Sequence, residues 1–176
     1  MENPLLTFAS PSIINGDGSG ATVATHEIAH SWTGNLVTNE NWDSFWLNEG
    51  FTRFLERKVM RKDEGDEYYK VASKVGNATM YFNMLEFGMD DSYSSLFPQT
   101  GKNDPDDAFS RVPYEKGFQF ATFLDELIGY EDFNTFFRGY LMKYANGLVN
   151  SYIFKTEFET FVETTYDADY AADILD

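Results

Sequence analysis

The sequence HEIAHSWTGNLVTNENWDSFWLNEGF, residues 26–51, contains the pattern around which the rest of the chain is arranged. His26 and His30 stand four positions apart at its start. On an α-helix, residues with this spacing lie on one face, so both imidazoles can point at one ion. Neutral imidazole is a common zinc ligand, and a catalytic zinc site takes three protein ligands and leaves one position for water. These residues therefore predict a helix that carries two zinc ligands.

Two carboxylates in the same stretch complete the predicted site. Glu27 follows the first histidine, where its carboxylate can accept a proton from water as a general base. Glu49 offers a third ligand from a second predicted helix. The pattern predicts one zinc ion held by His26, His30 and Glu49.

A chance match is the alternative, because a helix surface can show His-Glu-x-x-His without binding a metal. Two observations argue against chance. His26 and His30 are the only histidines in the chain. They also lie in a segment, residues 21–32, that reads as a partly buried helix, where an unpaired polar pair would be costly. We therefore prefer the zinc interpretation.

Length and composition predict one folded domain over residues 1–176. Hydrophobic residues make up 43% of the chain and aromatic residues 18%, which excludes a disordered protein. Cysteine is absent, so disulfides do not stabilise the fold.

The sequence has no apolar run of the roughly 18 residues that a membrane span needs. It also lacks the basic start and apolar core of a secretory signal. We expect a cytoplasmic protein without a membrane partner.

The charge of the chain is strongly one-sided, at −16. This argues against nucleic acid or anionic membrane as a partner, because phosphate binding relies on clustered lysines and arginines. It is compatible with a cationic substrate, such as the ammonium end of a peptide. Plain solubility, or adaptation to salt or cold, explains the charge more simply. Charge alone does not decide the function.

Hydrophobic periodicity predicts an α+β domain that is predominantly helical. Residues 1–10 read as a short N-terminal strand with Pro4 near its edge, and residues 12–20 read as a loop. The second helix is expected to be capped by Asp43 or Ser44, to carry Glu49 and to end at Gly65, with residues 56–67 as its solvated, charged end. Further helices are expected over residues 68–87, 114–128, 132–143 and 152–165. Their aromatic stripes are interpreted as core.

Three stretches together resemble the M1 family of zinc aminopeptidases, which are gluzincins. Met1-Glu2-Asn3 is similar to the tail of the family's G-x-M-E-N exopeptidase motif, and residues 26–51 resemble its zinc segment throughout. VPYEKG, residues 112–117, resembles the segment that carries its catalytic tyrosine. The segments MENPLLTF, SWTGNLVTN and VPYEKGF are closest in sequence to the leukotriene A4 hydrolase branch and its bacterial aminopeptidase relatives. The similarity runs from Met1 to roughly Tyr140.

The resemblance implies a thermolysin-like catalytic core that removes the N-terminal residue of peptides with a zinc-activated water. His26, His30 and Glu49 would hold the zinc, with Glu27 as general base. Peptides with a free N-terminus would be the substrates.

The resemblance also assigns roles outside the zinc segment. Glu2 would bind the α-amino group of the substrate, and Tyr114 would donate a hydrogen bond to the oxyanion. Asp106 matches an acidic position that lines the substrate pocket. Asn48, inside the zinc segment, and Glu56, beyond it, could orient the metal ligands.

Two departures from the family pattern keep alternatives open. Phe109 stands where the leukotriene A4 hydrolase branch often has a second tyrosine, which weakens a lipid epoxide hydrolase reading more than the peptidase reading. Family members also have a β-rich domain, a β-lobe and a helical C-terminal domain that this chain lacks. We therefore expect a fragment of a larger multidomain protein. A zinc-stabilised fragment or binding domain without activity is the alternative from a different class.

Overall fold

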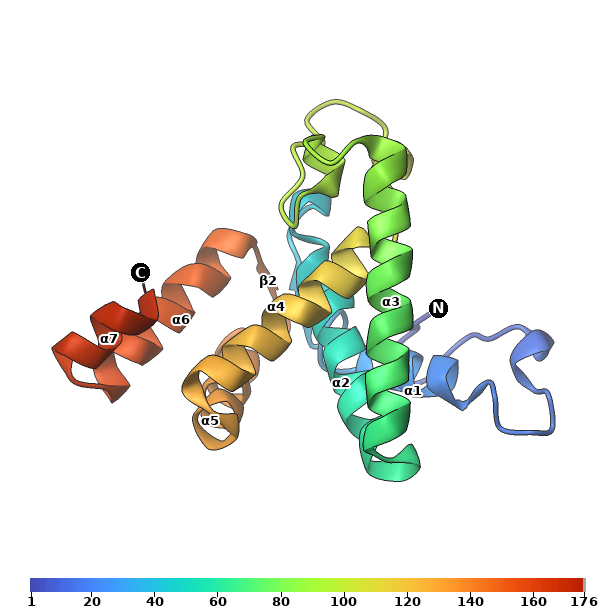
Figure 1. Cartoon of the computed structure of the whole chain (residues 1–176), viewed down its shortest axis with the longest axis horizontal. Coiled ribbons are helices and arrows are strands. Elements are labelled where there is room, and N and C mark those ends of the chain that lie inside the picture. The colour runs from blue at the N-terminus through green and yellow to red at the C-terminus, as the bar shows by residue number, and fades with distance from the viewer. Residues whose placement is uncertain (176) are drawn as a thin grey trace.

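Residues 1–175, which the computed structural model describes, contain seven α-helices and two short strands (Figure 1). The helices are α1 (Ala21–Ala29), α2 (Trp46–Glu64), α3 (Asp66–Phe87), α4 (Val112–Ile128), α5 (Tyr130–Lys143), α6 (Ser151–Thr165) and α7 (Ala168–Leu175). The strands are β1 (Val37–Asn39) and β2 (Gly147–Val149), which pair in parallel with Val37 opposite Gly147. Short 3-10 turns cover Pro11–Ile13, Trp42–Ser44, Ser92–Ser94 and Pro105–Ala108. Over this range, every helix is too short or too polar to cross a membrane.

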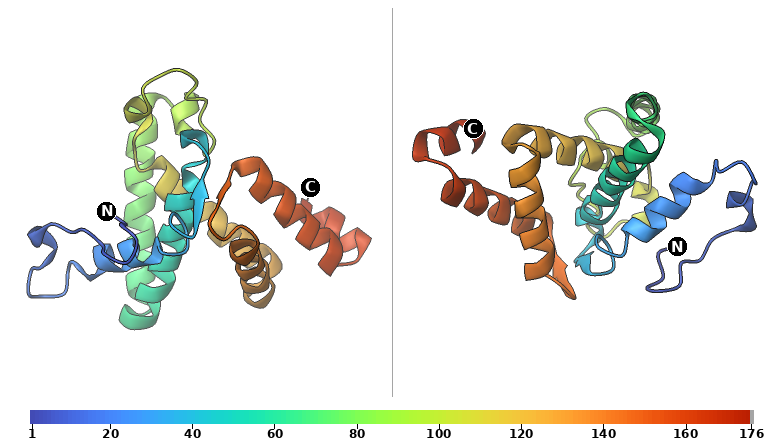
Figure 2. Two further views of the ribbon diagram at one scale, coloured as in Figure 1. Left: turned by 180° about the vertical axis from the view of Figure 1, so that it is seen from behind. Right: turned by 90° about the horizontal axis from the view of Figure 1, so that it is seen from below.

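Helix α2 is the centre of the arrangement. It packs against α1, α3 and α4, and α4 crosses it diagonally in Figure 1. Helices α5, α6 and α7 continue from the far end of α4, while the segment before α1 projects to the opposite side (Figure 2). The β1–β2 pair joins the N-terminal and C-terminal parts of the chain, because β1 follows α1 and β2 follows α5. The facing sides of α1, α2 and the start of α4 therefore lie close together.

Aromatic side chains fill the core between α2, α4, α5 and α6. The ring of Phe51 on α2 stacks on that of Phe137 on α5, with centroids 4.7 Å apart. Both belong to a buried cluster that extends to Phe154 and Phe158 on α6. The interpretation of the aromatic stripes as core is confirmed for most of their members; Phe123 is the exception and is exposed.

The fold class is confirmed, but the predicted N-terminal strand is wrong. Residues 1–10 form a turn, in which the amide of Leu6 donates to the carbonyl of Asn3 and the amide of Phe8 to that of Met1. A strand needs a neighbour to accept its ladder of hydrogen bonds, and within residues 1–175 this segment has none. The strands instead form at residues 37–39 and 147–149.

Helix boundaries differ modestly from the predictions. Helix α1 ends at Ala29, and α2, with Glu49 inside it, ends before Gly65 as expected. Helix α7 was not predicted. The expected solvated face at residues 56–67 is wrong at its start, because Glu56 and Arg57 are buried. Their side chains find ionic partners on neighbouring elements, which periodicity within one helix does not reveal.

Candidate active site

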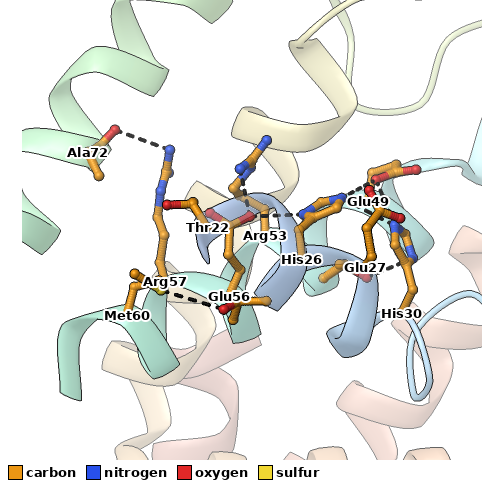
Figure 3. Close-up of polar contacts among 12 residues, drawn as sticks. Thr22, His26, Glu27, His30, Glu49, Arg53, Glu56, Arg57, Met60 and Ala72 are labelled. Carbon is orange, nitrogen blue, oxygen red and sulfur yellow. Dashed lines mark hydrogen bonds and ion pairs between the residues drawn. The ribbon is translucent and has the colours of Figure 1, made fainter. Parts of the chain in front are cut away.

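Helices α1 and α2 bring His26, His30 and Glu49 to one buried point (Figure 3). The Nε2 atoms of the two histidines lie 3.2 Å apart. Glu49 Oε2 lies 3.2 Å from His26 Nε2 and 3.3 Å from His30 Nε2. The histidines are four residues apart on α1, and Glu49 stands in the first turn of α2. Two imidazole nitrogens and one carboxylate oxygen facing one point form the donor set that zinc favours.

The other ring nitrogen of each histidine is held by a hydrogen-bond partner. His26 Nδ1 lies 2.9 Å from Glu56 Oε2, and His30 Nδ1 lies 2.8 Å from the carbonyl oxygen of Thr33. A carbonyl oxygen only accepts, so His30 Nδ1 donates and its Nε2 keeps the lone pair that a metal needs. Such partners orient metal-binding histidines and raise their basicity. Glu56 therefore lies where the sequence predicted an orienting residue.

Within residues 1–175, the Asn48 side chain forms no hydrogen bond with a proposed metal ligand. Its side-chain oxygen accepts a hydrogen bond of 2.9 Å from the amide of Asn39 in β1. Asn48 thus attaches the strand to the first turn of α2, next to Glu49.

Electrostatics at this point favour a charged Glu49. Burial by itself raises the pKa of this carboxyl, but its contacts with the imidazole rings of His26 and His30 outweigh burial and lower the pKa of Glu49 to about 2. Burial lowers the pKa of His26, whereas its hydrogen bonds to Glu49 and Glu56 raise it, and the net direction is upward. A cation is thus favoured among these residues, which is the electrostatic requirement for a metal site.

Glu27 and Glu2 lie beside this cluster. Carboxylate oxygens of both residues and a ring nitrogen of His30 lie within 4.8 Å of one another. The carbonyl of Glu2 accepts a hydrogen bond of 2.7 Å from the Asn35 side chain, which holds the N-terminal turn against the connection between α1 and β1. The amino nitrogen of Met1 lies 3.0 Å from Glu27 Oε2. The structure therefore places the carboxylate of Glu2 next to that of Glu27.

Tyr114 reaches the same point from the first turn of α4. Its ring stacks on that of His26 with centroids 6.0 Å apart. Burial, reinforced by the negative charge of Glu49, raises the pKa of Tyr114 well above its usual value. The phenol is therefore protonated at neutral pH and remains a hydrogen-bond donor.

Asp106 lies in a pocket of about 210 Å³ on the outer side of Tyr114. The pocket is mostly apolar and is lined by Trp42, Phe45, Tyr93, Leu96, Pro98, Phe109 and Pro113, among others. The rings of Phe45 and Phe109 lie edge-on to Tyr114 at 6.1 and 6.4 Å. Asp106 thus lines a cavity whose aromatic walls contact Tyr114, and it does not belong to the group formed by His26, His30 and Glu49.

Sequence reasoning missed Arg53, Thr52 and Glu115, which all lie behind the cluster. The hydroxyl of Thr52 lies 3.1 Å from His30 Nδ1, and Arg53 donates to Glu56. Glu115 follows Tyr114 in the sequence and is buried. These three residues stand among apolar residues at helical spacing. That position could have indicated that their polar side chains face the interior.

The chain is similar to proteins of known family over nearly its whole length. The family model described as "Peptidase family M1 domain" matches residues 1–171. Leucine aminopeptidase 2 of Ajellomyces capsulatus is 42% identical over 168 residues, which are 96% of this chain and 27% of that protein. Leucine aminopeptidase 2 of Chaetomium globosum is 46% identical over 162 residues, which are 92% of this chain and 26% of that protein.

Solved structures agree with these relatives. Native leukotriene A4 hydrolase from Saccharomyces cerevisiae superimposes with a TM-score of 0.89 at 37% identity, covering 99% of this chain and 27% of that one. An M1 zinc metallopeptidase from Deinococcus radiodurans shares the fold, with a TM-score of 0.62 at 22% identity, over 87% of this chain and 31% of that one. The chain therefore spans little more than a quarter of the length of its curated relatives. Because the family model covers all but the last few residues, the chain belongs to peptidase family M1.

Proposed function

We propose that this chain is the catalytic core of a zinc-dependent aminopeptidase, which hydrolyses the N-terminal residue of peptides. One observation carries the proposal: His26, His30 and Glu49 converge on one buried point with the carboxylate of Glu27 beside them. This donor set fits one zinc ion, and membership of peptidase family M1 implies that metal. We further propose that residues 1–176 form one domain of a longer protein, whose other parts would complete the substrate cleft.

When bound, zinc supplies Lewis acidity, which makes water more acidic and polarises a carbonyl oxygen. Glu27 would take the proton from the attacking water and later return it to the leaving amine. Tyr114, protonated at neutral pH, would donate a hydrogen bond to the oxyanion as it develops. Glu2 would pair with the α-ammonium group of the peptide and thereby select the first peptide bond. Asp106 would contribute to the wall of the adjoining pocket.

Hydrolysis of a lipid epoxide is the second candidate function. The superposition on the yeast leukotriene A4 hydrolase structures favours it, since those proteins match at 36–37% identity. Phe109, at the pocket beside Tyr114, offers no hydroxyl to an epoxide. A zinc-stabilised domain without activity is the remaining alternative, because most of the length of the relatives lies outside this chain.

The proposal is tested by cleavage of aminoacyl anilides by the zinc-loaded chain, with N-acetylated anilides as substrate control. Glu27→Gln removes the general base but no metal ligand. Glu126→Gln, an exposed position on α4, is the matched control. We expect hydrolysis of free-amine substrates only, its loss in Glu27→Gln and its retention in Glu126→Gln, with the same zinc content in all three chains.

Three other results would exclude the general-base role of Glu27 or favour one of the alternative functions. Undiminished hydrolysis by Glu27→Gln would exclude the general-base role. Zinc binding without hydrolysis by the unsubstituted chain would favour the inactive domain. Turnover of an epoxide but not of anilides would favour the second candidate function.

A further inference from the structure

Arg53 occupies a position between two parts of the proposed active site. Its side chain projects from α2, one turn after Glu49, and is largely buried. Arg53 Nη1 donates a hydrogen bond of 2.6 Å to Glu56 Oε2. The same oxygen lies 2.9 Å from His26 Nδ1, so one carboxylate oxygen joins the guanidinium to the imidazole (Figure 3).

The other side of the guanidinium faces helix α4. Arg53 Nε lies 3.5 Å from Glu115 Oε1, and the guanidinium carbon lies 5.8 Å from the centre of the Tyr114 ring. Tyr114 and Glu115 are consecutive residues in the first turn of α4. Arg53 therefore contacts both the residue that orients His26 and the turn that carries the proposed oxyanion donor.

Glu115 is itself held rigidly by a second arginine. Arg57 Nη1 lies 2.8 Å from Glu115 Oε2, and Arg57 Nη2 donates 2.9 Å to Glu115 Oε1, in a buried two-point pair. A Cβ atom on Gly76 of α3 would lie 2.2 Å from Glu115 Oε2, so only glycine leaves room for this pair. Because Arg57 already fixes Glu115, that carboxylate gives Arg53 a stationary point of attachment.

Two buried carboxylates are matched by two guanidinium groups only when Arg53 is present. Glu56 and Glu115 are both buried, and Arg53 and Arg57 are the cations that contact them. Without Arg53, His26 would be the one remaining partner of the Glu56 side chain within residues 1–175, and the orientation of this buried carboxylate would be less restrained. The imidazole of His26 would then lose the support that sets its orientation.

We propose that Arg53 is a positioning residue, which sets the orientation of His26 through Glu56 and holds the first turn of α4, with Tyr114, at a constant distance from it. The inference rests on the function proposed above. It predicts that metal binding and turnover both depend on a side chain that touches neither metal nor substrate.

The experiment compares Arg53→Met with Lys58→Met in the full chain. Lys58 makes a matched control, because its Nζ lies 2.9 Å from Asp125 Oδ2 and so forms another ion pair between α2 and α4, away from the zinc cluster. Three quantities are measured: zinc affinity by chelator competition, kcat and KM for an aminoacyl anilide, and the absorption spectrum of the cobalt-substituted chain.

We expect Arg53→Met to weaken zinc binding and lower kcat, each by about tenfold, which is the lower end of the effect of removing supporting partners. KM should change less than kcat, and the cobalt spectrum should shift. Lys58→Met should leave all three unchanged, even where it lowers thermal stability. Arg53→Lys should restore zinc affinity in part, because lysine keeps one ionic contact but cannot reach both carboxylates with a planar fork.

Unchanged zinc affinity and cobalt spectrum in folded Arg53→Met would overturn the inference. Equal losses in Arg53→Met and Lys58→Met would also overturn it, because they would indicate general loosening of α2 against α4. If Arg53→Met does not fold, zinc affinity and the cobalt spectrum of Arg53→Lys decide, and values equal to those of the unsubstituted chain would reject the role. If the unsubstituted chain hydrolyses nothing, the proposed function fails, whereas zinc affinity and the cobalt spectrum still test Arg53.

Discussion

Gly50 of α2 and Gly117 of α4 touch backbone to backbone where these helices cross. A Cβ atom on Gly50 would lie 2.6 Å from Gly117 Cα, and a Cβ atom on Gly117 would lie 2.7 Å from Gly50 Cα. Glu49 precedes the first glycine, and Tyr114 lies one turn before the second. The absence of both side chains therefore determines how closely a proposed metal ligand and a proposed catalytic phenol approach each other.

Gly50→Ala and Gly117→Ala should each destabilise the fold, because backbone atoms cannot yield as a flexible side chain would. Overpacking of this kind costs about 1–3 kcal/mol, measurable by urea unfolding. Gly139→Ala is the control, since a Cβ atom on this α5 glycine meets nothing within 4 Å. It should stabilise the helix by about 0.5–1 kcal/mol. Equal stability of all three variants would contradict the tight crossing.

Removal of a proposed metal ligand should abolish the stabilisation that zinc provides. A metal that binds only the folded chain stabilises it by about 2.7 kcal/mol at one hundred times its Kd. The melting temperature of the unsubstituted chain should therefore rise with zinc and fall again with a chelator, whereas that of His30→Ala should respond to neither. A zinc response retained by His30→Ala would count against the ligand set.

Tyr114→Phe should lower kcat and leave zinc content unchanged, because it removes only the hydroxyl. Loss of one donor to an oxyanion typically reduces kcat about 10²–10³-fold. Tyr140→Phe is the matched control: Tyr140 is buried in the aromatic core, and within residues 1–175 its hydroxyl has no hydrogen-bond partner. A comparable kcat for the two variants would exclude the oxyanion role.

Alkaline pH should weaken the packing of the chain after α6 against α5. Tyr166 donates a hydrogen bond of 2.6 Å to Asp132 Oδ2. Burial, together with this bond and the charge of Asp132, raises the pKa of Tyr166 from 10.0 to about 12. The folded state therefore favours the neutral phenol, and its contribution is fully present below pH 10 and lost as pH rises to about 12.

Urea unfolding between pH 10 and pH 12 tests this contribution. The unsubstituted chain should lose more stability over that interval than Tyr166→Phe, whose side chain cannot ionise. Parallel loss in both chains would show that Tyr166 does not contribute.

Sequence patterns predicted the helices well, because each buries an apolar stripe whose spacing is visible within the helix itself. They failed at Met1–Ser10, because a strand depends on a partner that the segment does not contain. They also misjudged Glu56 and Arg57. Burial of a charged residue requires a partner, and the partners His26 and Glu115 lie on other helices at distant positions in the sequence.

The sequence by itself determined the chemistry that could meet in this protein: two histidines at helical spacing, the carboxylates of Glu27 and Glu49, and the helices that carry them. Local spacing suffices for the two histidines, because residues one turn apart on a helix share a face. Only the tertiary structure decided which supporting residues stand behind them. The Arg53–Glu115 contact and the Gly50–Gly117 crossing join segments far apart in the chain, and such contacts depend on how whole helices pack.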